Sequence, residues 1–147
     1  MQKIDFNDAV DSVVASDPRY AGDAYFFLQE VLTQAVDKHY KETGGEDRHV
    51  GGDELLEVFR MRARKKFGPM AISVFEEWGI QSCEDIGEMV FNLIDVGAFG
   101  KSDRDCREDF SGGYDFRPKF LQNFRFFFKF EKFQHLLFPC FGPIKKY

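Results

Sequence analysis

Residues 82–94 read SCEDIGEMVFNLI and carry the clearest secondary-structure signal in this chain of 147 residues. Their apolar side chains recur every three or four positions, at Ile86, Met89, Val90, Leu93 and Ile94. This spacing is typical of a helix that buries one face. Ser82 and Asp85 have the spacing of a capping box, so the helix is expected to begin beside Ser82. Gly87 lies next to the apolar face and would let a neighbouring helix approach closely.

The same periodicity predicts further helices on both sides of this segment. They are expected over residues 6–15, 22–42, 53–67 and 69–78, with one more short helix leading from residue 102 toward residue 110. Breaks at Asp17-Pro18, Gly44-Gly45 and Gly68-Pro69 separate the first four. We therefore predict an all-α fold, a single compact domain of five or six short helices.

Charge and aromatic content divide the chain at residue 116. Residues 1–116 contain 13 Lys and Arg against 24 Asp and Glu, a net charge of −11, whereas residues 117–147 contain seven basic residues and one acidic residue, a net charge of +6. Ten of the 19 Phe fall within residues 116–141. We predict a helical domain over 1–116 and an aromatic, basic tail over 117–147. The tail fits an element packed on the domain, or an end altered by a frameshift, better than a binding segment.

The composition is that of an ordinary globular protein, with 44% apolar residues. Its three cysteines, Cys83, Cys106 and Cys140, are an odd number without a C-x-x-C pair, which favours reduced thiols over a disulfide framework. The first residues lack the apolar core of a signal peptide. No stretch approaches the roughly 18 apolar residues of a membrane-spanning helix. We therefore expect a cytoplasmic protein with no transmembrane segment.

Two nucleic-acid or phosphate motifs are excluded by charge and by missing residues. The helices on either side of Gly79 imitate a helix-turn-helix, but the second one carries four acidic residues and no Lys or Arg between residues 83 and 100. It would be repelled by double-stranded DNA. The glycine-rich loop over residues 44–52 lacks G-K-[ST] and leads into Asp53-Glu54, so we interpret it as a flexible connection and not a phosphate loop. The basic cluster over residues 60–66 is interpreted as a solvated helix end.

No metal or cofactor motif is present in the sequence. His39, His49 and His135 are far apart and occur in no metal-binding pattern, so no metal and no cofactor are predicted. Nucleophilic motifs are also missing. Cys83 lies at a predicted helix start, which can lower a thiol pKa, but we interpret it as an inert thiol.

Three functions remain open. The absence of a catalytic constellation favours a non-enzymatic helical module that binds another protein. A small-ligand or catalytic site around the loop that carries His49, together with Asp109 and Asp115, is the alternative, because glycine-rich loops often carry function. The third hypothesis is single-stranded nucleic-acid binding by the aromatic, basic tail.

Several blocks in residues 49–116 also resemble a known family. They read HVGGDELL (49–56), FGPMA (67–71), WGI (78–80), EDIGEMVFNL (84–93), EDF (108–110) and YDF (114–116). In this serial order they are similar to an uncharacterised family of hypothetical proteins from planctomycete and verrucomicrobial genomes, over about residues 6–116. The resemblance implies a bacterial source, and it implies no particular function, because this family has no assigned activity. The tail departs from this family, whose chains end soon after the YDF block.

Overall fold

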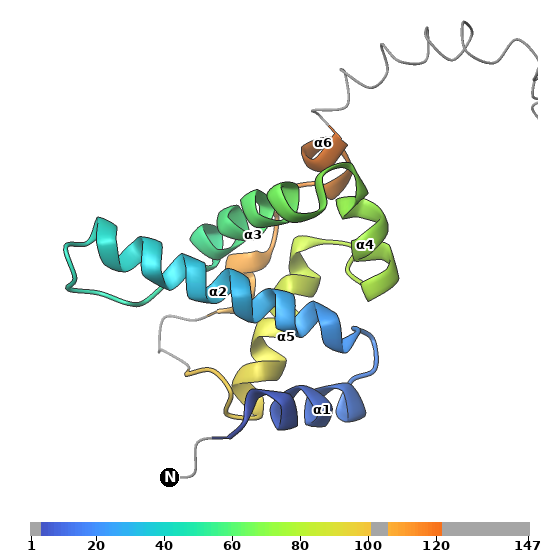
Figure 1. The fold of residues 1–147 in the computed structure, drawn as a ribbon, viewed down its shortest axis with the longest axis horizontal. Coiled ribbons are helices and arrows are strands. Elements are labelled where there is room, and N and C mark those ends of the chain that lie inside the picture. Colours follow the sequence, from blue (N-terminus) through green and yellow to red (C-terminus); the bar gives the residue numbers. More distant parts are fainter. Residues whose placement is uncertain (1–3, 101–105, 122–147) are drawn as a thin grey trace, which may run out of the picture.

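The computed structural model describes residues 4–100 and 106–121, and every regular element in them is helical (Figure 1). The elements are α1 (Phe6–Ser16), α2 (Gly22–Glu42), α3 (Gly52–Phe67), the 3₁₀ helix η1 (Gly68–Met70), α4 (Ala71–Trp78), α5 (Cys83–Asp95), the 3₁₀ helix η2 (Arg107–Phe110) and α6 (Phe116–Leu121). The predicted all-α fold is confirmed. None of these helices is long and apolar enough to cross a membrane.

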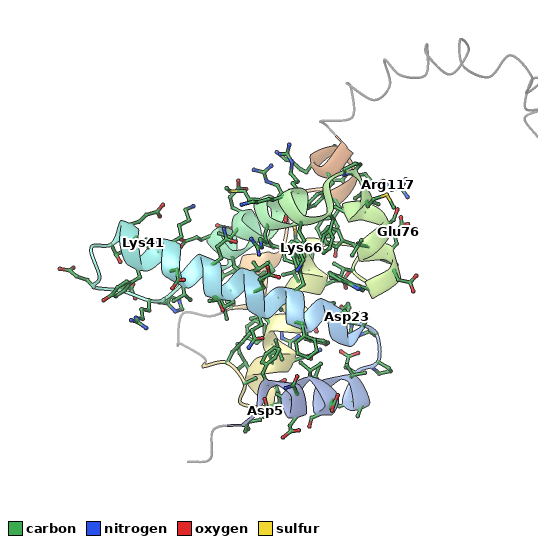
Figure 2. The ribbon with its side chains drawn as sticks, in the orientation of Figure 1. Asp5, Asp23, Lys41, Lys66, Glu76 and Arg117 are labelled. Carbon is green, nitrogen blue, oxygen red and sulfur yellow. The ribbon has the colours of Figure 1, made fainter. Side chains whose placement is uncertain are left out.

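The longest helix, α2, organises the others. It packs against α1 on one side and against α3 on the other, and α4 contacts both α2 and α3 (Figure 1). α5 joins the two sides, because it packs against α1 and also contacts α3. The charged side chains labelled in Figure 2 point outward from this arrangement, and no charged or polar residue of the described part is fully buried.

Aromatic rings fill the core between α3, α4 and α6. Phe75 of α4 is only 1% exposed, and its ring lies 5.4 Å from that of Phe59, 5.4 Å from that of Phe116 and 5.2 Å from that of Phe120. The single tryptophan, Trp78, borders the same cluster. The core therefore continues across residue 116, where the composition changes. The rest of the predicted tail, residues 122–147, lies outside the described residues.

The local signals around α5 act as expected from the sequence. The Asp85 carboxylate accepts hydrogen bonds from the backbone N–H of Gln81 at 2.8 Å and of Ser82 at 3.1 Å, which satisfies the helix start. A Cβ atom on Gly87 would lie 2.8 Å from Phe110. The close approach of a neighbouring helix to Gly87 is thus confirmed, and the neighbour is the 3₁₀ helix η2. This 3₁₀ helix is shorter than the helix expected before Phe110, whose predicted start at residue 102 lies outside the described residues.

A polar network ties the α1–α2 corner to α5. The Asn92 side-chain amide donates to Asp17 at 3.0 Å and to the Tyr25 hydroxyl at 3.2 Å. The hydrogen bond from Arg19 keeps the pKa of Asp17 well below its usual range, with a smaller contribution from Asn92. The corner is therefore held by ionised and neutral hydrogen bonds together.

Candidate functional site

An apolar pocket with a polar rim lies where α2, the start of α3, the end of α5 and η2 meet. Its volume is about 280 Å³. Apolar side chains supply most of its wall: Leu32, Val36, Val50, Leu55, Val90, Phe91, Ile94, Ala98, Phe99 and Phe110. Four polar side chains also line it: Arg48, Cys106 and Asp109, which are exposed, and His49, which is half-buried. We call this cavity the His49 pocket.

The segment that carries His49 to the pocket is held by hydrogen bonds within the loop. The Thr43 hydroxyl donates to the carbonyl oxygen of His39 at 2.9 Å and also contacts the backbone of Asp47. One Asp47 carboxylate oxygen accepts the backbone N–H of His49 at 2.8 Å. These hydrogen bonds link the two ends of the loop, and Asp47 holds the backbone beside His49.

The other side of the rim depends on a close approach between α3 and η2. A Cβ atom on Gly52 would lie 2.7 Å from the Cβ atom of Asp109. Glycine is therefore required at this position for η2 to reach the helix start. The Asp109 carboxylate also accepts the backbone N–H of Cys106 at 3.2 Å, which caps the start of η2.

Behind the loop, the His39 ring lies between two carboxylates. Its Nδ1 atom is 2.7 Å from Glu54 of α3, and its Nε2 atom is 3.7 Å from the second carboxylate oxygen of Asp47. The Nε2 atom is buried and has no hydrogen-bond partner. The sequence showed His39 only as a histidine outside any metal-binding pattern. No local motif could reveal this arrangement, because its three members come from α2, the loop and α3.

Two of the three site residues predicted from the sequence meet at this pocket. His49 and Asp109 both line it, although 60 positions separate them. Asp115 is not part of its lining; instead its carboxylate accepts the backbone N–H of Arg117 at 3.2 Å, at the start of α6. Sequence reasoning missed Arg48 and Cys106 as rim residues, since neither belongs to a recognisable motif.

The two described cysteines are poorly suited to nucleophilic chemistry. The Cys106 thiol donates to the Glu108 carboxylate, and this hydrogen bond raises the thiol pKa. Burial raises the pKa of Cys83, whose sulfur contacts the backbone of Tyr114. Both therefore keep their proton at neutral pH, and a neutral thiol is a weak nucleophile. The interpretation of Cys83 as an inert thiol is in keeping with this. Within residues 4–100 and 106–121 no group of three His, Cys, Asp or Glu side chains could hold a metal ion.

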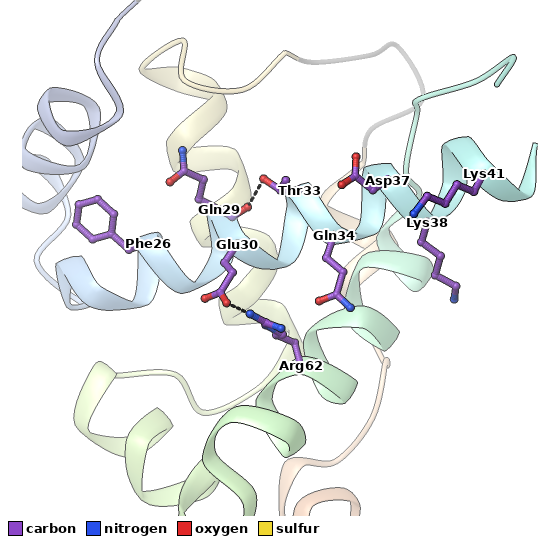
Figure 3. Close-up of a pocket in the computed structure, with 9 residues that line it drawn as sticks. All are labelled: Phe26, Gln29, Glu30, Thr33, Gln34, Asp37, Lys38, Lys41 and Arg62. Carbon is purple, nitrogen blue, oxygen red and sulfur yellow. Dashed lines mark hydrogen bonds and ion pairs between the residues drawn. The ribbon is translucent and has the colours of Figure 1, made fainter.

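A second hollow follows the outer face of α2 and is lined by polar side chains (Figure 3). It has a volume of about 720 Å³ and is open to solvent. Glu30 lies on its wall and forms ion pairs with two residues of the basic cluster, Arg62 and Lys66. Phe26 is the one apolar residue of its described lining.

No protein-family model, curated protein or solved structure matches this chain.

Proposed function

We propose that the protein binds a small, mainly apolar ligand with one polar group in the His49 pocket. The observation that carries the proposal is the lining: among the described residues, ten apolar side chains and four polar side chains line the pocket, and three of the polar ones are exposed. Small-molecule sites commonly combine an apolar wall with a few polar groups that fix the ligand's orientation.

The volume narrows the size of the ligand. An engineered apolar cavity of about 150 Å³ in another protein binds benzene. At about 280 Å³, the His49 pocket has room for a bicyclic ring or a short acyl chain. Either would leave its polar end near His49 and Asp109, which supply a possible donor and an acceptor.

The chemistry of the rim favours binding over turnover. Nucleophilic catalysis needs a thiolate or a hydroxyl activated by a neighbouring base. The one thiol on the rim, Cys106, has a raised pKa because it is hydrogen-bonded to Glu108. We therefore assign the pocket to reversible ligand binding.

A protein-binding module is the second candidate, and the same pocket supports it. A cavity of this volume also accommodates one large apolar side chain, and aromatic anchors in such pockets dominate many protein interfaces. A ligand that occupies the pocket would then compete with the partner protein.

The test is an NMR titration of the ¹⁵N-labelled full chain with indole, a bicyclic probe that has one N–H donor. We expect saturable amide shifts confined to residues around the His49 pocket. Ala98→Phe adds an aromatic ring to the pocket wall and should abolish these shifts. Ala15→Phe makes the same change on the exposed face of α1, outside the pocket, and should retain them.

Two results would contradict the proposal. One is a set of shifts that spreads over the surface without saturating. The other is unchanged indole binding in an Ala98→Phe protein that circular dichroism shows to be folded. Ala98→Phe places a ring at the turn after α5, so Val36→Phe provides a second obstruction from α2 that leaves this turn unchanged. It should also abolish binding.

A further inference from the structure

The Asp47 carboxylate in the loop faces one side chain of α2, that of His39. The Nε2 atom of His39 lies 3.7 Å from this carboxylate, about 0.8 Å farther than a usual hydrogen bond. The other Asp47 oxygen accepts the backbone N–H of His49. One carboxylate therefore lies between His39 and the rim residue His49.

The hydrogen-bonding capacity of the ring depends on its proton count. A neutral imidazole has one donor and one acceptor, whereas the protonated ring has two donors. When Nδ1 donates to Glu54, a neutral ring turns the lone pair of Nε2 toward an Asp47 oxygen, which is also an acceptor. This explains why the buried Nε2 atom has no hydrogen-bond partner. A second proton gives Nε2 a hydrogen that Asp47 can accept.

The charged groups around the ring leave these two carboxylates as its partners. Glu54 faces it from α3 and Asp47 from the loop. On α2 itself, the flanking Lys38 and Glu42 form an ion pair with each other at 3.9 Å. The backbone N–H of His49 lowers the pKa of Asp47, and the charges of His39 and His49 add to this effect. Asp47 is therefore ionised throughout the range in which histidine changes charge, about pH 5 to 8.

We propose that His39 and Asp47 form a proton-controlled latch that positions the loop at the His49 pocket. Protonation of His39 draws Asp47 into a charge-assisted hydrogen bond, which adds a second restraint to the loop beside the existing hydrogen bond from the His49 N–H. Loss of the proton removes this second restraint. The latch would regulate the proposed ligand site, so its biological role rests on the proposed function. Its hydrogen bond can be followed without any ligand.

The first experiment follows the latch in the free protein by NMR. A His49→Gln background removes the titration of the rim histidine, which would otherwise obscure the signal. We expect the ring of His39 and the backbone amide of Asp47 to titrate with one shared midpoint. Glu46→Gln makes the matched charge change one residue away, on an exposed side chain, and should leave the shared midpoint in place. Separate midpoints, or a loop amide that does not respond to pH, would overturn the latch.

The second experiment measures indole binding to the full chain at pH 5.5 and pH 8. We expect wild type and Glu46→Gln to bind about fivefold more tightly at pH 5.5, at the lower end of usual couplings between sites. Asp47→Asn keeps an acceptor for the His49 N–H and gains an amide donor for neutral Nε2. This bond forms only with the neutral ring, because a protonated Nε2 would face another donor. Asp47→Asn should therefore reverse the dependence and bind more tightly at pH 8. A fivefold dependence that persists in Asp47→Asn would contradict the latch.

The two experiments separate the latch from the ligand site. Coupled titration in the free protein without indole binding would refute the proposed function and leave the latch standing. Indole binding without coupled titration would refute the latch alone.

Discussion

The turn between α4 and α5 offers a sharp test of how this chain is packed. Gly79 ends α4 with a φ of +84°, in the left-handed region that side chains other than glycine disfavour. A Cβ atom at this position would also lie 2.2 Å from the carbonyl oxygen of Arg19, in the α1–α2 corner. That oxygen belongs to the backbone, so no side-chain rotation can relieve the contact. Gly79→Ala should therefore destabilise the protein through two separate effects.

The size of each effect can be worked out from the structure. A left-handed conformation costs a residue with a Cβ atom about 1–2 kcal/mol. Separating the two segments breaks the hydrogen bond from the Ala21 N–H to the Trp78 carbonyl, which is 3.1 Å long, for about 1 kcal/mol. Overpacking adds about 1 kcal/mol or more. We expect a total loss of about 3–5 kcal/mol, a large part of the stability of a domain this size.

Gly112→Ala is the matched control. Gly112 also has a positive φ, +68°, but a Cβ atom there would meet nothing within 4 Å. It should lose only the conformational cost of about 1–2 kcal/mol. Urea unfolding followed by far-UV circular dichroism gives both free energies of unfolding, and this signal does not depend on Trp78 beside the substitution. Equal losses in the two variants would refute the close packing of Gly79 against Arg19.

Three further predictions follow from the core, the polar corner and the buried thiol. Phe120→Ala should cost about 3–5 kcal/mol in urea unfolding, because Phe120 is 4% exposed and packs on Phe75; a loss below about 1 kcal/mol would contradict its place in the core. Arg19 keeps the pKa of Asp17 low, so this carboxylate stabilises the protein above its unfolded pKa of about 4, and that stability is lost as the pH falls below it. Asp17→Asn should flatten the decline in unfolding free energy between about pH 5 and pH 2, and an unchanged slope would contradict this. Burial raises the pKa of Cys83, so mass spectrometry should find it alkylated by iodoacetamide only in urea, and rapid alkylation of the native protein would contradict its burial.

The helices could be predicted from the sequence because their signals are local. The expected helix over residues 22–42 agrees with α2 at both ends, since Gly44-Gly45 stops a long apolar stripe. α5 begins where its capping residues indicated. These features depend on residues within a few positions of one another, which a single sequence displays directly.

The extent of the core could not be predicted in the same way. Residue 116 marks a change in charge and in phenylalanine content, and the sequence suggested a domain boundary there. Phe116 and Phe120 pack on Phe75, about 40 positions earlier in the chain, which agrees, for residues up to 121, with the alternative of an element packed on the domain. Composition describes what a segment contains, whereas membership of a core depends on which surface the segment meets.

The candidate site also depends on packing that the sequence does not show. The sequence predicts a site at His49 because this residue lies on a glycine-rich loop, and the glycines are interpreted as a source of flexibility. Gly52 instead begins α3 and lets Asp109 come within contact of the helix, while Gly87 admits Phe110 against α5. At both positions the absence of a Cβ atom allows η2 to pack directly against the helix. Two glycines in different helices therefore let η2 form part of the wall of the His49 pocket. A single sequence does not show this, because it does not show which segment packs against each glycine.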